Sequence, residues 1–168
     1  MAIVSSAADG LRVASRATIL QLRGPGLTSN ALEREASRLV GSSPVPVILS
    51  SRCDVALAAG AAGVNLPEHD ILVSDARKLL DQRLVGRSVH SMEAALQVEG
   101  DGADFVIYGP VWQSTSHPDV SPVGVAALAE VARTLRIPVL AIGGVTEDRI
   151  AECHAAGAAG FAAIRMFR

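Results

Sequence analysis

The chain has 168 residues, of which 49% are hydrophobic and 3% aromatic, and its fifteen basic residues are nearly balanced by seventeen acidic ones. This length fits a single domain with a sizeable core. The absence of any long run of one charge excludes a general nucleic-acid surface. No apolar run approaches the ~18 residues of a membrane span, so no membrane partner is expected.

The two cysteines, Cys53 and Cys153, lie far apart and lack metal-binding spacing. The first six residues are too short and too polar for a signal peptide. These features predict a reduced, soluble protein of the cytoplasm.

Apolar segments of strand length alternate with helical segments along the chain. Strands are expected at 18–23, 45–51, 63–66, 84–90, 105–111, 139–143 and 160–166, with a thin candidate at 1–4. Helices are expected at 30–40, 73–80, 91–100, 123–135 and 146–156. This alternation and the scarcity of aromatic residues predict an α/β protein with a buried parallel sheet.

A unit of helix end, glycine turn and new strand recurs at 58–64, 100–106 and 155–161. Such repetition is typical of a (β/α)8 barrel of the TIM type, whose αβ turns lie opposite the active site. We therefore predict one barrel domain over residues 1–168. Its first strand and last helix are expected to be incomplete, because 1–4 is short and the chain stops at Arg168.

Two consecutive strands end in residues suited to ligand binding. The strand at 105–108 is followed by a polar loop, and the strand at 139–142 by paired glycines, which let backbone N–H groups approach an anion. The residues concerned are Ser114, Ser116, His117, Gly143 and Gly144. Adjacent strand ends of this kind predict a phosphate pocket.

Five motifs occur in order at strand ends: Gln21-Leu22-Arg23, Gly63-Val64-Asn65-Leu66 with Asp70, Gly86-Arg87-Ser88-Val89-His90, the segment 109–118, and Ala141-Ile142-Gly143-Gly144-Val145-Thr146. Together they resemble the thiamine phosphate synthase and TenI family, from about Ala7 to the C-terminus. The resemblance implies a TIM barrel that binds thiazole phosphate and, in the synthases, hydroxymethylpyrimidine diphosphate with Mg²⁺. In the synthases diphosphate departs, and the thiazole nitrogen captures the pyrimidine carbocation to give thiamine phosphate. The TenI relatives include tautomerases, which move a proton on a thiazole phosphate precursor.

The resemblance also implies where the phosphates bind. The paired glycines and the backbone of Ala163 and Ile164 match a cup of N–H groups that binds phosphate. Ser114, Ser116 and His117 match a Thr-x-Thr-Lys segment that holds phosphate oxygens, with histidine as a weaker, pH-dependent cation in the lysine position.

Further roles follow for the strands at 18–23 and 84–90. Gln21 and Arg23 match residues that face the barrel interior and reach the diphosphate or the pyrimidine, and Arg23 is expected to be buried against a ligand anion. Ser88 matches a serine near the substrate. Arg23 and Ser88 are therefore the candidate catalytic residues, and His90, on the same strand face as Ser88, is a candidate proton carrier.

The sequence departs from the family pattern at several positions. Pro25 replaces a phosphate-binding lysine, and Ser50-Ser51 replaces the Asn-Asp of the magnesium site, whose second carboxylate is retained as Asp70. A weakened Mg²⁺ site is expected, because Mg²⁺ favours carboxylate and other hard oxygen ligands. Pro110 stands where the tautomerases have a catalytic histidine.

Three functions remain open from the sequence: a thiamine phosphate synthase, which is a transferase; a thiazole tautomerase; and a non-catalytic protein that binds thiazole phosphate or thiamine phosphate. In each case the partners are small phosphorylated molecules. The resemblance also implies a homo-oligomer, since relatives are often oligomeric, although no interface is legible.

Overall fold

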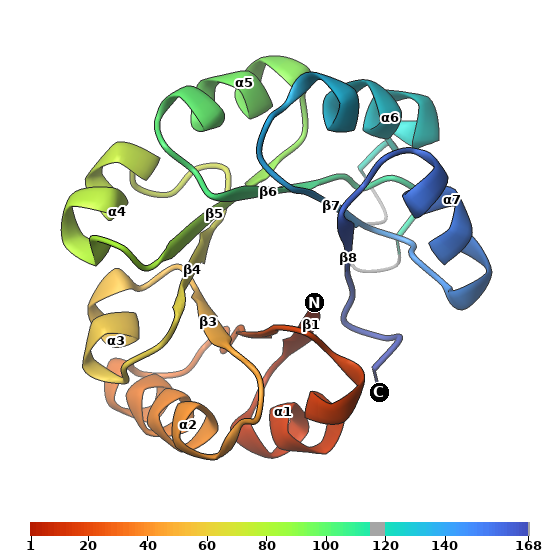
Figure 1. Cartoon of the computed structure of the whole chain (residues 1–168). Coiled ribbons are helices and arrows are strands. Elements are labelled where there is room, and N and C mark those ends of the chain that lie inside the picture. The colour runs from red at the N-terminus through yellow and green to blue at the C-terminus, as the bar shows by residue number, and fades with distance from the viewer. Residues whose placement is uncertain (115–119, 168) are drawn as a thin grey trace.

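The computed structural model describes residues 1–114 and 120–167, which form a ring of eight parallel strands surrounded by helices (Figure 1). The strands pair in chain order from first to last. They are β1 (Ala2–Val4), β2 (Leu20–Leu22), β3 (Val47–Ser50), β4 (Gly63–Leu66), β5 (Leu84–Val89), β6 (Phe105–Tyr108), β7 (Val139–Ile142) and β8 (Gly160–Ala162). The predicted TIM-type barrel is confirmed.

The helical segments lie on the outside of this ring (Figure 1). They are α1 (Ala7–Val13), η1 (Ala14–Arg16), α2 (Ser29–Ser42), α3 (Cys53–Ala58), α4 (Val73–Leu80), α5 (Met92–Gly100), α6 (Gly124–Thr134), η2 (Glu147–Arg149) and α7 (Ile150–Ala155). No helix of the described residues has the length and apolarity needed to cross a membrane.

Side-chain caps fix where several helices begin. Ser6, Thr28 and Ser91 each precede a helix and accept a hydrogen bond from the backbone N–H three residues later, at 3.1, 3.3 and 3.1 Å. A hydroxyl in this position satisfies an N–H group that has no acceptor within the helix. These caps set the entry of α1, α2 and α5.

The helices α1 and α3 were not expected from the sequence. Helix α1 has only seven residues and contains Gly10, which disfavours a helix in isolation. A Cβ at Gly10 would lie 2.6 Å from Cδ1 of Leu39, so glycine lets α1 pack closely on α2. Helix α3 has six residues and follows two left-handed residues, Ser51 and Arg52. Tertiary packing, rather than local propensity, stabilises both.

The barrel closes weakly between β1 and β8. The two strands share one isolated bridge, between Ala2 and Ala163, in which Ile3 donates to Ala163 at 2.9 Å and Ala163 donates to Met1 at 3.2 Å. The thin strand candidate at 1–4 is therefore confirmed as β1. The barrel is nearly closed, with one seam that full strand pairing does not seal.

The described residues contain no helix after β8. Instead Phe167 packs near the seam, with its ring 6.3 Å from that of Phe161 and 6.0 Å from the guanidinium of Arg16. Phe167 is 7% exposed. One aromatic side chain thus covers apolar surface where the other strands have a following helix.

Side chains inside the barrel form stacked layers of four, as expected for eight strands staggered by one residue per strand. The pairing registers place Gln21, Asn65, Ile107 and Ala162 in one layer. They place Ile3, Ser50, Ser88 and Ile142 in the layer above it, nearer the carboxyl ends of the strands. In both layers the polar side chains come from β2 to β5 and the apolar ones from β6, β7, β8 and β1.

Candidate active site

The polar half of the barrel interior contains two buried acceptors without partners. Nδ2 of Asn65 donates to Oγ of Ser88 at 3.0 Å, which links β4 to β5. Oε1 of Gln21 and Oδ1 of Asn65 have no hydrogen-bond partner among the described residues, and both side chains are 3% exposed. Burying an acceptor without a donor is costly, so this layer is suited to a ligand that brings N–H or O–H groups.

The structure brings Asp70 and Ser51 together beside this layer. The hydroxyl of Ser51 donates to Oδ2 of Asp70, and the N–H of Ile71 donates to Oδ1 of the same carboxylate at 2.7 Å. Ser51 adopts φ 62°, a left-handed conformation, which turns the chain from β3 toward α3. The retained carboxylate and one of the two substituted serines therefore share a site.

A buried arginine fixes the loop that carries Asp70. The guanidinium of Arg87, on β5, donates to the carbonyl oxygen of Ile71 at 2.6 Å and to that of Asp70 at 3.2 Å. Arg87 is 6% exposed and lies on the outer face of its strand. It holds the loop from behind while the Asp70 carboxylate binds Ser51.

On the other side of the barrel, the loops after β6 and β7 lie against each other. The N–H of Val111 donates to Ile142 at 2.8 Å, and the N–H of Trp112 donates to Gly143 at 3.1 Å. Gly143 and Gly144 have φ 88° and 66°. A Cβ at Gly144 would lie 2.7 Å from the backbone oxygen of Gln113, so only glycine permits this approach.

The predicted phosphate residues fall on or near these loops. Among the described residues, no hydrogen-bond acceptor receives the N–H of Gly143 or Gly144, which leaves both donors for an anion. Ser114, which lies in the loop between β6 and α6, is half-buried. Ser116 and His117 lie outside the described residues.

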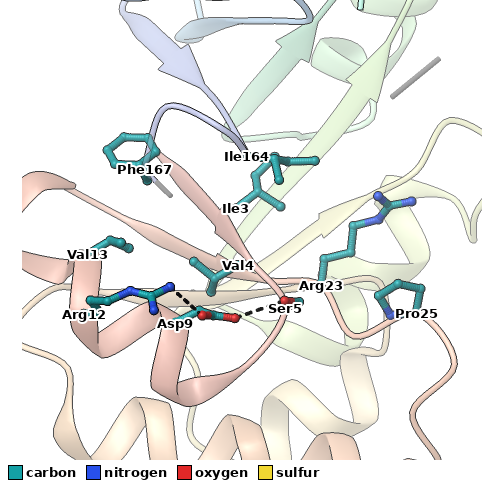
Figure 2. A pocket seen from close by; sticks show the side chains of 10 residues that line it. All are labelled: Ile3, Val4, Ser5, Asp9, Arg12, Val13, Arg23, Pro25, Ile164 and Phe167. Atoms are coloured by element: carbon teal, nitrogen blue, oxygen red, sulfur yellow. Dashed lines mark hydrogen bonds and ion pairs between the residues drawn. The ribbon is translucent and has the colours of Figure 1, made fainter. Parts of the chain in front are cut away.

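A pocket of about 140 Å³ opens at the carboxyl ends of β1, β2 and β8, beside the seam (Figure 2). Arg23 and Ile164 both line it, together with Ser5 and Asp9. Asp9 forms an ion pair with Arg12 at 2.7 Å, and hydrogen bonds from Ser6 and Ser5, with this arginine, hold the pKa of the Asp9 carboxyl below its usual range. Two predicted site residues thus share this seam pocket.

Two sequence expectations need correction here. Arg23 is exposed rather than buried, because it follows the last residue of β2 and extends beyond the packed interior. Ala163 donates its N–H to Met1 across the seam, so that N–H serves barrel closure. Of the Ala163 and Ile164 pair, Ile164 is the one that lines the seam pocket.

His90 connects three strand ends. Its Nδ1 donates to the carbonyl oxygen of Gly109, after β6, and its Nε2 lies 3.8 Å from Oε2 of Glu68, after β4. The carbonyl contact fixes the ring through one nitrogen and leaves the other facing a carboxylate. This arrangement favours a structural role for His90, which links the loops, over a role as proton carrier.

Sequence reasoning missed Asn65 and Arg149 as site residues. Asn65 is a polar residue in the otherwise apolar strand β4. Alternation along the strand places its side chain on the interior face, and this was the signal available in the sequence. Arg149 bonds the Gly144 carbonyl and covers Trp112, a contact between residues 37 positions apart that no local pattern indicates. The described residues contain no group of three or more His, Cys, Asp or Glu side chains that could hold a metal ion.

The sequence profile of a family described as "Thiamine monophosphate synthase" matches residues 2–167. The chain belongs to this thiamine monophosphate synthase family. "Putative thiamine-phosphate synthase 2" of Aquifex aeolicus is 37% identical over 152 residues, covering 89% of this chain and 82% of the relative. "Thiamine-phosphate synthase" of Chloroflexus aurantiacus is 36% identical over 152 residues, covering 88% of this chain and 70% of the relative.

The solved structure of "Thiamine phosphate pyrophosphorylase" from Pyrococcus furiosus superposes with a TM-score of 0.88 at 27% identity, covering 97% of this chain and 83% of that one. The resemblance to the thiamine phosphate synthase and TenI family is thereby confirmed. These matches support thiamine-phosphate synthase activity. Such an enzyme is a transferase of thiamine biosynthesis. The family implies phosphorylated thiamine precursors as substrates.

Proposed function

We propose that the chain couples hydroxymethylpyrimidine diphosphate to thiazole phosphate, releasing pyrophosphate and forming thiamine phosphate at the carboxyl ends of the barrel strands. The bond between the pyrimidine methylene carbon and the diphosphate oxygen breaks, and the thiazole nitrogen forms the new bond to that carbon. The electron pair of the broken bond leaves with the diphosphate.

The observation that carries this proposal is the pair of buried acceptors in the barrel interior. The pyrimidine has an exocyclic amino group, whose two N–H donors match the free oxygens of Gln21 and Asn65. Ser88 holds the Asn65 side chain in place through its hydroxyl, so the acceptor of Asn65 is oriented before substrate arrives. This preorganisation reduces the ordering that binding requires.

The phosphate groups fit the remaining surfaces. The free N–H groups of Gly143 and Gly144 suit the thiazole phosphate, with Ser114, Ser116 and His117 supplying further contacts from the neighbouring loop. Arg23, exposed just after β2, can pair with the departing diphosphate without first breaking an ion pair, since none of the described residues forms one with it. The pyrimidine lies between the two phosphate regions.

The donors present fit Mg²⁺ through one carboxylate and hydroxyl oxygens. Asp70 would hold the ion, with Ser50 and Ser51 beside it, and Mg²⁺ would neutralise charge on the leaving diphosphate. The Ser51 hydroxyl already occupies Oδ2 of Asp70, so the metal site is weaker than one built on two carboxylates. We therefore propose that this chain needs a higher Mg²⁺ concentration than a member that retains Asn-Asp at positions 50 and 51.

The test is to incubate the protein with both substrates, with and without Mg²⁺, and to follow thiamine phosphate and pyrophosphate. Formation of both products is expected. Binding of thiazole phosphate without product, or conversion of the thiazole precursor alone, contradicts the synthase proposal and favours a binding protein or a tautomerase respectively.

Two variants test whether the polar side of the barrel interior binds the pyrimidine substrate. Asn65→Leu removes one amino-group acceptor and should raise KM for the pyrimidine substrate about tenfold while changing KM for thiazole phosphate little. Ile107→Val alters the same layer on its apolar side and serves as the matched control. Equal effects of both variants on the pyrimidine KM would contradict the role of Asn65.

Arg23→Ala tests the diphosphate site separately. It should weaken pyrimidine diphosphate binding much more than thiazole phosphate binding, because its guanidinium faces the departing group. Equal losses for the two ligands would refute this division of roles.

A further inference from the structure

The loops after β6 and β7 form one unit at the phosphate side of the site. Among the described residues, two backbone hydrogen bonds join them, from Val111 to Ile142 and from Trp112 to Gly143, at 2.8 and 3.1 Å. A Cβ at Gly144 would lie 2.7 Å from Cβ of Trp112. A side chain at position 144 would therefore prevent the two loops from lying this close together.

One side chain from beyond both loops ties them together. Nη1 of Arg149, at the end of η2, donates to the carbonyl oxygen of Gly144 at 2.7 Å. The guanidinium carbon lies 5.1 Å from the centre of the Trp112 ring, within the range of a cation–π contact. Arg149 thus holds the loop after β7 through a carbonyl and the loop after β6 through an indole.

Arg149 forms no ion pair among the described residues, although its charge contributes to lowering the pKa of the adjacent, exposed Asp148. Among the described residues no carboxylate lies within 4.0 Å of its guanidinium nitrogens. Arg149 is half-buried, and one of its five N–H donors is used on Gly144. The guanidinium therefore lies next to Gly143 and Gly144, whose N–H groups have no acceptor in the described part of the chain.

We propose that Arg149 is a positioning residue for the phosphate site. It clamps Trp112 and Gly144, which keeps the loop bearing Ser114 in register with the N–H groups of the glycine turn, and it keeps a positive charge beside them. This inference rests on the proposed function, and it adds a residue to which neither the motifs nor the comparisons assign a role.

Trp112 makes the clamp measurable, because it is the single tryptophan of the chain. Fluorescence excited at a wavelength that only tryptophan absorbs therefore reports on the surroundings of Trp112. Arg149→Gln removes the cation from the indole face, so the emission of Trp112 should shift and acrylamide should quench it more strongly. Arg133→Gln removes the same charge from an exposed position on α6 and should change neither signal.

The decisive readout is the division between KM and kcat. Arg149→Gln should raise KM for thiazole phosphate about tenfold and change kcat less than about threefold, since the residue aligns the binding loops without contacting the reacting atoms. Arg149→Lys keeps the charge but loses the planar fork, and should recover part of the loss. An unchanged KM in Arg149→Gln, or an equal rise in Arg133→Gln, would overturn the inference.

Titration with inorganic phosphate, followed by calorimetry, separates this inference from the proposed function. If the wild-type protein makes no thiamine phosphate but Arg149→Gln weakens phosphate binding about tenfold, the clamp stands and the synthase proposal fails. If the wild-type protein makes thiamine phosphate but the variant binds phosphate as well as wild type does, the clamp fails. If Arg149→Gln has the same urea midpoint as Arg133→Gln, the variant is folded. Either result then concerns the phosphate site and not the stability of the protein.

Discussion

Gly144→Ala tests the close approach of the two phosphate-side loops. Gly144 has φ 66°, where an L side chain costs roughly 1–2 kcal/mol. Its Cβ would also lie 2.7 Å from a backbone oxygen and from Cβ of Trp112, and overpacking of this kind costs about 1–3 kcal/mol. Together these costs predict a loss of about 2–5 kcal/mol in the free energy of unfolding.

Gly102→Ala is the matched control for that loss. Gly102 has φ 91°, and a Cβ there would have no heavy atom within 4 Å, so only the backbone cost of roughly 1–2 kcal/mol applies. Urea unfolding of wild type and both variants, with m-values compared, gives the difference. If Gly144→Ala loses no more stability than Gly102→Ala, the close approach is not a steric constraint and the reasoning is refuted.

Three other outcomes are expected. Burial raises the pKa of the Cys53 and Cys153 thiols, so a disulfide reagent at pH 8 should react slowly with native protein and quickly in urea; a fast native thiol would contradict this. The hydrogen bond from Arg52 lowers the pKa of Asp54 to about 2, and Arg52→Gln should return it toward ~3.9 in an NMR titration. This exposed pair should contribute little to the free energy of unfolding, and that contribution is lost as pH falls from about 4 toward 2; a large loss of stability over this pH range would contradict the expectation. Arg87→Met leaves two loop carbonyl groups unpaired and should cost about 1–3 kcal/mol in urea unfolding, whereas a change below about 0.5 kcal/mol would show that the loop holds itself.

The central part of the barrel could be predicted closely because its signals are local. Helix α4 at Val73–Leu80 matches the expected bounds, and β4 at Gly63–Leu66 does as well. The expected strands at 45–51 and 160–166 were too long, because the pattern does not reveal where an apolar chain leaves the sheet. The expected helix at 146–156 divides into η2 and α7.

The site was harder to predict than the fold. Arg23 was expected inside the barrel from alternation along β2, but the strand ends one residue earlier and its side chain is exposed. The role of Asn65 depends on the stagger between neighbouring strands, which places Asn65 in the same layer as Gln21, two strands away. That stagger cannot be inferred from the sequence. The contact between Arg149 and Trp112 depends on how two loops meet after folding, for which no sequence signal exists.

The barrel interior has polar side chains on one side and apolar side chains on the other, and this division affects how such a protein can evolve. In the proposed function, side chains such as Gln21 and Asn65 recognise the substrate on the side of β2 to β5, and a single-codon change can replace either of them. On the side of β7, the groups proposed to bind phosphate are backbone N–H groups, which a single-codon change does not remove unless it replaces a glycine and distorts the loop. Specificity for the ring of one substrate can therefore drift by point mutation, while the ability to hold a phosphate persists. A lineage of this barrel would keep its anion site and vary the molecule attached to the anion.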